Sequence, residues 1–295
     1  PPASSSTPSE TTPAKSLDQK TVRVGIAYDP NNLEPWAALN NGRIDVLRCV
    51  YEFLFDREGT GGKLIPCIGS SYEQVDDYTY NVHIYDNVYD SKGNHITADD
   101  IVFDFQTAIE LGNLVVGLGN LTEVKKLDTY SVQFVFNSKA AGVFENAITN
   151  VYIVSKTAYE ADPNRMSSNP VGTGAYAVEN FIPGSSVTFV KRNDYWQSDD
   201  KRAPLSQANI GRIVYKVIPE KSQMTIALQN HDVDLAYYVQ STDISHFEEG
   251  GDSKGFSVLA KPADLAQVIF FNCDSSSVFS NVALRQCVAY AINNA

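Results

Sequence analysis

The sequence predicts a mixed α/β protein built around a sheet. Segments whose apolar residues alternate, as in a strand, are interleaved with segments whose apolar residues recur every three or four positions, as in a helix. The 295 residues are 43% apolar, enough to bury the core of one large domain or two ordinary ones. No apolar run approaches the roughly 20 residues of a membrane-spanning helix. The interleaving favours an α/β or α+β class over a helical bundle or a β-sandwich.

The first half of the chain predicts two strands and a capped helix. Residues 21–27 (TVRVGIA) alternate, and the turn residues 29–32 (DPNN) follow them. Residues 78–85 alternate in the same way. Thr97 and Asp100 have the spacing of a capping box, so we expect a helix that ends at Gly112. Its predicted apolar stripe consists of Ile101, Phe105, Ala108 and Ile109.

The second half predicts more strands. A turn followed by the strand SVQFVF falls within 126–137, and a turn at Pro183-Gly184 joins a predicted hairpin. A helix is expected near 220–229. The remaining predicted strands cover 176–181, 186–191, 213–218, 234–238, 258–260 and 267–271.

The two ends of the chain differ in character. Residues 1–13 (PPASSSTPSETTP) are almost all Pro, Ser and Thr, and we expect residues 1–20 to form a disordered tether. Such a tether is either a spacer behind a lipid-bearing N-terminus or a terminus without function. At the other end, Ser280 is the predicted cap of an amphipathic helix, and the chain stops at Ala295, soon after its apolar stripe. We therefore expect a truncated chain.

Composition and motifs exclude several function classes. The 23 basic and 35 acidic side chains leave a net charge of −12, which argues against nucleic acids and anionic membranes as partners. Residues 59–63 (GTGGK) do not fit a phosphate loop, because Arg57 stands where its first glycine belongs; a hairpin turn is the better interpretation. Asp99 and Asp100 are explained by helix capping rather than acid–base chemistry.

Histidines and cysteines give no metal or nucleophile motif either. The four histidines lack HxxxH or HExxH spacing, and scattered exposed histidines are the favoured explanation. The cysteines lack a CxxC pair, which leaves two disulfides or free thiols open: Cys49, Cys67, Cys273 and Cys287. We predict a protein that is not an enzyme and that carries no cofactor.

Five segments of the chain carry a recognisable order of motifs. They are GKLIP with SYEQVDDYTY (62–80), VYDSKGNHITADDIVF (88–103), NPVGTGAY with PG and KRNDYW (169–196), ALQNHDVD (227–234), and FN with VALRQCVAYAI (271–292). In wording and order they resemble the extracellular solute-binding proteins of peptide ABC importers, the oligopeptide, dipeptide and nickel-binding family 5. The resemblance extends over residues 21–295, with departures such as Asn293 where the family has Asp.

The resemblance implies a lobe with the periplasmic-binding-protein fold. It implies a main sheet domain with a mixed sheet formed by 21–48 and 167–272, and an inserted α+β subdomain at 49–166. Residues 273–295 would enter a second lobe, most of which is missing. Family members enclose their ligand between the two lobes, so this chain alone is expected to bind peptide weakly.

The resemblance also implies a ligand site. A receptor for peptides of many sequences can pair with the peptide backbone, as a strand adds to a sheet edge. By position, the residues expected to line the cleft follow three strands: Tyr28, Asp29, Pro30, Asn31 and Asn32; Tyr238, Val239 and Gln240; and Asp264 and Leu265.

The implied function is capture of peptides and their delivery to ABC permease subunits. The protein would act as a monomer, without nucleic acid, either lipid-anchored on the extracellular face of a bacterial membrane or in a periplasm. A family member for another solute (an oligosaccharide, a nickel chelate or an opine) is the first alternative. A surface enzyme such as a glycosidase, with two carboxylates facing each other across a cleft, is the second.

Overall fold

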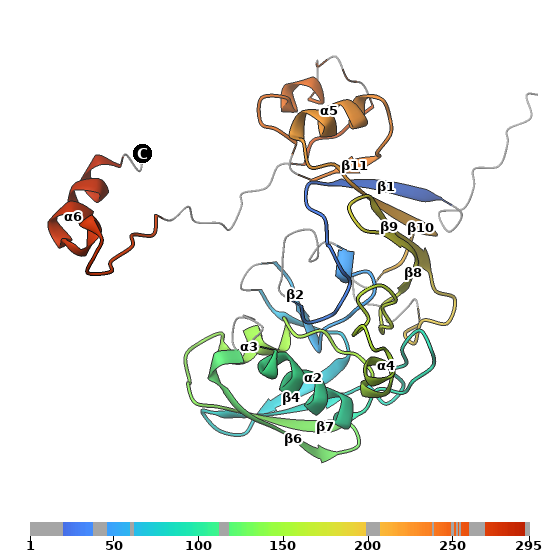
Figure 1. The fold of residues 1–295 in the computed structure, drawn as a ribbon. Coiled ribbons are helices and arrows are strands. Elements are labelled where there is room, and N and C mark those ends of the chain that lie inside the picture. The colour runs from blue at the N-terminus through green and yellow to red at the C-terminus, as the bar shows by residue number, and fades with distance from the viewer. Residues whose placement is uncertain are drawn as a thin grey trace, which may run out of the picture. The chain divides into compact units, whose positions relative to one another are not determined.

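The computed structural model describes residues 20–37, 46–59, 62–111, 118–198, 207–237, 239–248, 251, 253, 255–259 and 269–292. The chain divides into two compact units, with the boundary after Val258. The first unit contains sheets and helices, which confirms the predicted mixed α/β class (Figure 1). The predicted N-terminal tether lies outside the described residues, apart from Lys20.

The main sheet has five strands in the order β11-β1-β10-β9-β8. β1 (Thr21–Ile26) pairs in parallel with β10 (Arg212–Val217) on one side and with β11 (Leu235–Ala236) on the other. β9 (Ser186–Lys191) and β8 (Tyr176–Ile182) continue the sheet as an antiparallel hairpin. All five strands were predicted, although β11 is shorter than the predicted 234–238.

Local contacts fix the position of β11 and of the helix beside it. Arg23 on β1 donates from Nε and Nη2 to the two carboxylate oxygens of Asp234, at 3.0 and 2.6 Å, immediately before β11. Helix α5 (Lys221–Gln229) packs close to β1 at Gly25. A Cβ on this glycine would lie 2.3 Å from the Sδ of Met224, so a larger residue here would displace the end of the Met224 side chain.

A second sheet has the strand order β4-β5-β7-β6 and is covered by helix α2 (Ala98–Glu110). Its strands are β4 (Gly69–Gln74), β5 (Thr79–Ile84), β7 (Ser131–Phe136) and β6 (Leu121–Asp128). The two central strands, β5 and β7, were predicted. The two edge strands were not, because they lack a clear apolar alternation: β4 and β6 are mostly exposed.

The capping box of α2 is formed as predicted. The Asp100 carboxylate accepts a hydrogen bond from the backbone N–H of Thr97 at 2.8 Å, and Asp100 N donates back to Thr97 O at 3.1 Å. The last helical residue is Glu110, and Gly112 lies outside the described residues. The predicted hairpin turn at 59–63 is also confirmed, since it joins β2 (Phe55–Arg57) to β3 (Leu64–Pro66) in an antiparallel pair.

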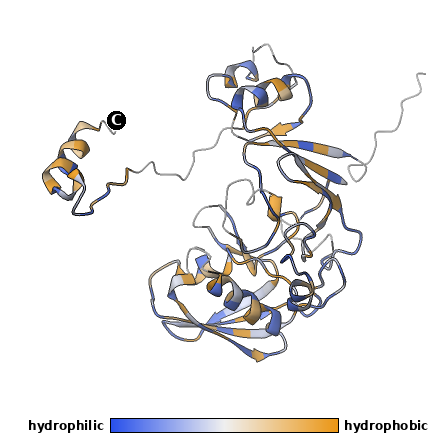
Figure 2. Cartoon of the chain, in the orientation of Figure 1, coloured by the Kyte–Doolittle hydropathy of each residue, from blue (hydrophilic) through white to orange (hydrophobic). Residues whose placement is uncertain are grey.

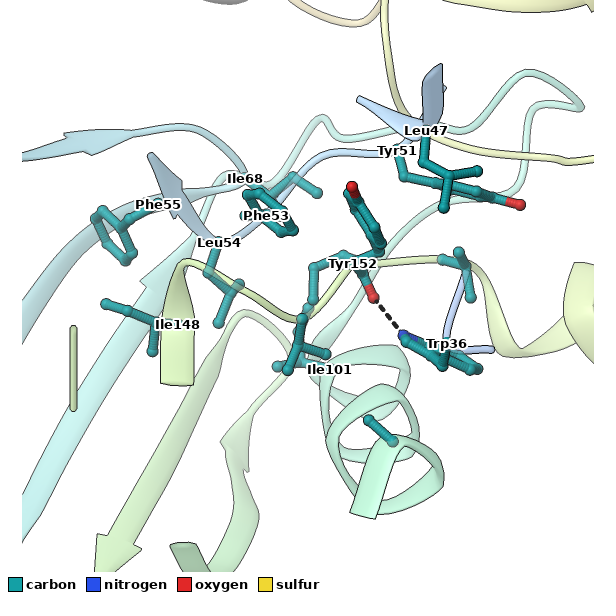
Figure 3. Packing of buried hydrophobic residues seen from close by; sticks show 14 of the residues in the cluster. Trp36, Leu47, Tyr51, Phe53, Leu54, Phe55, Ile68, Ile101, Ile148 and Tyr152 are labelled. Carbon is teal, nitrogen blue, oxygen red and sulfur yellow. Dashed lines mark hydrogen bonds between the residues drawn. The ribbon is translucent and has the colours of Figure 1, made fainter. Parts of the chain in front are cut away.

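The main core is a single cluster of buried side chains that extends from the second sheet and α2 to strands β1, β9 and β10 of the main sheet. Trp36 is buried and donates from Nε1 to the carbonyl of Tyr152 at 3.0 Å, and the rings of Phe53 and Tyr152 stack beside it (Figure 3). The hydropathy colouring shows apolar residues on the strands and on α2 (Figure 2). The remaining helices of the first unit are α3 (Val143–Ile148), α4 (Lys156–Ala161), η2 (Leu118–Asn120) and η4 (Ile244–His246).

The second unit contains η5 (Val278–Ser280) and α6 (Val282–Ala291). The predicted cap Ser280 is wrong by one residue: Asn281 caps α6 and accepts from Ala283 N at 2.9 Å. An asparagine side chain reaches the first-turn amide from this position, whereas Ser280 closes the preceding 3-10 turn.

The last two predicted strands are wrong for the residues that are described. Val258 and Leu259, and likewise residues 269–271, are not in strands; the rest of the two ranges lies outside the described residues. Leu259 and Phe270 are 88% and 90% exposed. Apolar alternation makes a strand only where a neighbouring strand supplies hydrogen bonds and burial. The division into 21–48 with 167–272, 49–166 and 273–295 stays a prediction.

Candidate functional site

The carboxyl ends of three parallel strands meet at one edge of the main sheet. Because β10, β1 and β11 run in the same direction, the loops that follow them leave the sheet side by side. Tyr237, which follows β11, donates its backbone N–H to the carbonyl of Gly25 on β1 at 3.4 Å. Ile218, which follows β10, donates to the carbonyl of Ile26 at 2.8 Å. This carboxyl edge is the candidate binding site.

The loop after β1 is held in a fixed conformation. The Asp29 carboxylate accepts a hydrogen bond from the backbone N–H of Asn31 at 3.0 Å, and Asn31 has a left-handed φ of 60°. Asn32 donates to the carbonyl of Pro30 at 2.7 Å, and Leu33 donates to the carbonyl of Ser167 at 2.8 Å. These bonds organise the loop before any ligand arrives.

The loop after β11 is also anchored. The carbonyl of Gln240 accepts from Asp243 N at 2.8 Å, and its side-chain amide donates to Thr242 Oγ1 at 2.9 Å. The Thr225 hydroxyl on α5 donates to the Asp243 carboxylate at 2.7 Å. Hydrogen bonds from Thr225 and then Thr242 lower the pKa of Asp243, which keeps this carboxylate ionised.

The turn between β8 and β9 comes close to the Asp29 carboxylate. Gly184 has a φ of 75°, and a Cβ at this position would lie 3.9 Å from Asp29 Oδ2. The carbonyl of Ser185 accepts a hydrogen bond from Val217 N at 2.8 Å, which ties the turn to the end of β10. The β8–β9 turn therefore stands beside the loop that follows β1.

Seven of the ten predicted site residues lie in the described parts of the loops that follow β1 and β11. Tyr28 is 52% exposed and Asn31 is exposed, whereas Pro30 is buried, so the side chains of the first loop do not all face solvent. The residues present at this edge are Tyr28, Asp29, Pro30, Asn31, Asn32, Val239 and Gln240. Tyr238, Asp264 and Leu265 lie outside the described residues.

Sequence reasoning missed two features of this edge. Tyr237 is 40% exposed, but the predicted strand 234–238 placed it inside the sheet. Its exposure follows from the early end of β11. The Pro183-Gly184 turn was predicted only as a hairpin connection, and its approach to Asp29 depends on the strand order. No local sequence signal reveals either feature.

The arrangement suits binding. It offers backbone groups on ordered loops, exposed phenol rings at Tyr28 and Tyr237, and the Asp29 carboxylate. Within the part of the chain that the structure describes, no three His, Cys, Asp or Glu side chains are grouped as metal ligands. All four cysteines are free thiols, which resolves the alternative left open by their spacing.

Away from the candidate site, the buried carboxylate of Glu52 connects residues 49–67 to the segment that follows β9. Glu52 accepts hydrogen bonds from the Tyr195 hydroxyl at 2.5 Å and from Trp196 Nε1 at 3.0 Å, while Cys67 Sγ lies 3.6 Å away. Glu52 and Cys67 border a cavity of about 370 Å³. Burial raises the pKa of Glu52, and the hydrogen bonds oppose that rise. These contacts give Glu52 a structural role: its carboxylate holds the two segments together.

Comparison with known proteins gives a consistent result. The model of "Bacterial extracellular solute-binding proteins, family 5 Middle" matches residues 63–295. The dipeptide-binding protein of Escherichia coli K12 is 23% identical over 96% of this chain and 56% of its own length. The heme-binding protein A of Haemophilus influenzae is 23% identical over 96% of this chain and 54% of its own length.

Solved structures share the fold. The periplasmic binding protein DppA of Helicobacter pylori, in complex with the peptide STSA, superposes with a TM-score of 0.68 at 18% identity. The match covers 78% of this chain and 49% of that protein. The chain thus spans about half the length of the relatives that it matches.

Proposed function

Because the chain belongs to the bacterial extracellular solute-binding proteins of family 5, we propose that it captures oligopeptides or dipeptides outside the cell and delivers them to a membrane ABC permease. This family consists of binding proteins rather than enzymes. A second lobe, which would close over the ligand, is part of the proposal. The peptide complex of the related DppA supports this ligand class.

The observation that carries the proposal is that β1 and β11 are parallel neighbours, so the loops that follow them start at the same side of the sheet. Both loops are ordered by their own hydrogen bonds and present backbone groups beside exposed aromatic rings. Backbone groups are the same for every peptide sequence except at proline. A site that pairs with them therefore accepts many peptides, while roomy pockets accommodate their side chains.

Charge and length support the remaining parts of the proposal. A net charge of −12 disfavours nucleic acid as a partner. Among the described helices, none has the length and apolar character needed to span a bilayer. We propose a monomer that works in the periplasm or is held by a lipid anchor at the outer face of the membrane, with the Ser/Thr/Pro-rich segment as spacer.

Nuclear magnetic resonance titration tests the peptide site. Adding a mixture of dipeptides and tetrapeptides to the 295-residue chain should shift the amide signals of residues 28–32 and 239–240. The expected dissociation constant is about 1 mM, since one lobe supplies only part of the contacts. Tyr28→Ala should weaken binding, whereas Tyr78→Ala, at a similarly exposed tyrosine outside the site, should not. Shifts that are absent here or spread over the whole chain would refute the proposal.

The two exposed tyrosines favour a second candidate ligand class. Tyr28 and Tyr237 present aromatic faces at the same edge, and such faces stack on sugar rings or other flat ligands. The alternative is a binding protein for oligosaccharides or another non-peptide solute. The same titration with maltotriose and with heme separates the classes, because only the true class produces saturable shifts at residues 28–32.

A further inference from the structure

A large cavity borders β8, the strand at one edge of the main sheet. It measures about 750 Å³ and is formed by β8, by helix α4 and by the loop at residues 91–94. None of the described candidate-site residues, 28–32, 239 and 240, lines it. The proposed function therefore does not use this cavity.

The lining pattern shows that the cavity runs along the edge of β8. Five consecutive residues of this strand, 177–181, line it. Side chains of successive strand residues point to opposite faces of a sheet, so a cavity on one face would contact only every second residue. Within the described part of the chain, β8 pairs with a single strand, β9. Tyr176, the first residue of β8, donates its N–H to the carbonyl of Cys49 at 3.2 Å. The cavity thus borders a strand edge that is open from residue 177 onward.

The backbone groups at an open strand edge can bind another extended chain. In an antiparallel pair, alternate residues direct their N–H and C=O groups away from the partner strand, and these groups pair with a further extended chain. We propose that this cavity binds an extended peptide as a sixth strand, antiparallel to β8, with the C-terminal carboxylate of the peptide at Lys92.

The position of Lys92 sets the direction of the peptide. Ser91 donates its N–H to the carbonyl of Gly172 at 3.0 Å, which places this loop near the start of β8. The Asp90 carboxylate accepts from the backbone N–H groups of Lys92 and Asn94, at 2.8 and 2.9 Å, and orders the loop. A chain antiparallel to β8 ends near the start of that strand. Its carboxylate then meets the ammonium group of Lys92.

Lys92 is available for this contact. Within the described residues it forms no ion pair and is the one cation that borders the cavity. Of the two acids there, Glu179 is paired with Arg212. The other, Asp162, accepts a hydrogen bond from Asn164 N at 2.7 Å. A parallel peptide would instead place its ammonium terminus near Lys92, where like charges repel.

Self-association through the same edge is disfavoured. Two copies of β8 paired antiparallel about their centre would place Glu179 opposite Glu179. Like charges directly opposite each other destabilise a strand pair. The β-bulge between Val178 and Asn180 further weakens pairing with an identical strand. A separate peptide with an uncharged centre fits this edge better.

A pentapeptide copying residues 186–190 of β9 (SVTFV) is the probe, because β9 already pairs antiparallel with β8. It is labelled at its N-terminus and prepared both as the free acid and as the C-terminal amide. Fluorescence polarisation with the 295-residue chain should show saturable binding, with the acid about threefold to fivefold tighter, as expected for an exposed ion pair. Lys92→Ala should make the two affinities equal. Equal affinities for the unaltered protein would overturn the proposal.

A second pair of variants tests the location. Ala161→Trp on α4 fills the cavity and should weaken binding at least tenfold, whereas Glu160→Trp, on the same helix but not bordering the cavity, should not. Hydrogen exchange should slow at residues 177–181 when the acid peptide binds. Tyr28→Ala should leave all of these results unchanged, which separates this site from the carboxyl edge. No slowing at 177–181, or a peptide-independent dimer, would refute the inference.

Discussion

Replacing Asp104 with asparagine should change how the stability of the protein depends on pH. Asp104 lies on α2 and is fully buried. Its Oδ2 accepts a hydrogen bond from Val154 N at 3.1 Å, while its Oδ1 is buried without a hydrogen-bond partner. Burial, together with the nearby charge of Asp100, raises the pKa of Asp104 well above its ordinary value of 3.8. The native state therefore holds this proton to a higher pH than the unfolded chain does.

The sign and size of the effect follow from proton linkage. Above pH 4 the unfolded chain loses the Asp104 proton while the native state retains it, so rising pH favours unfolding. The free energy of unfolding should fall by about 1.4 kcal/mol for each pH unit until the native pKa is passed. The asparagine of the Asp104→Asn variant does not titrate. The stability of the variant relative to the parent should therefore rise with pH over the range in which the native carboxyl stays protonated.

Urea unfolding followed by circular dichroism at pH 4.5, 5.5 and 6.5 measures this difference. Only its slope with pH is used, because the unpaired amide of the variant adds an offset of about 1–3 kcal/mol that does not depend on pH. Asp99→Asn on the same helix is the matched control, because the Asp99 side chain is exposed and forms a surface ion pair with Lys126. A difference for Asp104→Asn that stays constant with pH would refute the assignment of a retained proton.

Two further predictions concern the buried polar groups. Glu52→Gln should lower the free energy of unfolding by about 1–3 kcal/mol, because it turns one acceptor oxygen into a donor beside the Trp196 N–H and other donors. Urea unfolding measures it, and a loss no larger than that of exposed Glu123→Gln would contradict the structural role. Burial raises the pKa of the Cys49 thiol to about 11, so at pH 8 it should react with Ellman's reagent only after unfolding. Two thiols, those of the exposed Cys273 and Cys287, are expected to react fast in the folded protein. Four fast-reacting thiols would show that Cys49 and Cys67 are accessible and would contradict the prediction.

Whether a strand could be predicted from the sequence depended on its position in the sheet. Central strands such as β5 and β7 bury one face and so alternate clearly, whereas β4 and β6, at the edges of the same sheet, are polar over most of their length. Conversely, the alternation at 267–271 did not produce a strand among its described residues. An alternation of apolar residues shows that one face of a segment can be buried. It does not show whether a neighbouring strand is present to form hydrogen bonds with that segment.

The candidate site shows the same limit. The loops at residues 28–32 and 239–240 were located from a resemblance in sequence, and their start at the same side of the sheet depends on the parallel pairing of β1 and β11. The exposure of Tyr237 depends on β11 ending at Ala236. Pairing between two segments about 210 residues apart produces no periodic pattern in the sequence of either segment.

The sequence by itself determined the mixed class, the capping box at Thr97 and Asp100, the hairpin at 183–184 and the family. These features rest on local backbone preferences or on several motifs in a fixed order. Only the tertiary structure decided the strand order, the neighbours of Asp29 and the open edge of β8. Which strand becomes an edge depends on long-range hydrogen bonds and burial, and these exist only once distant parts of the chain have packed together.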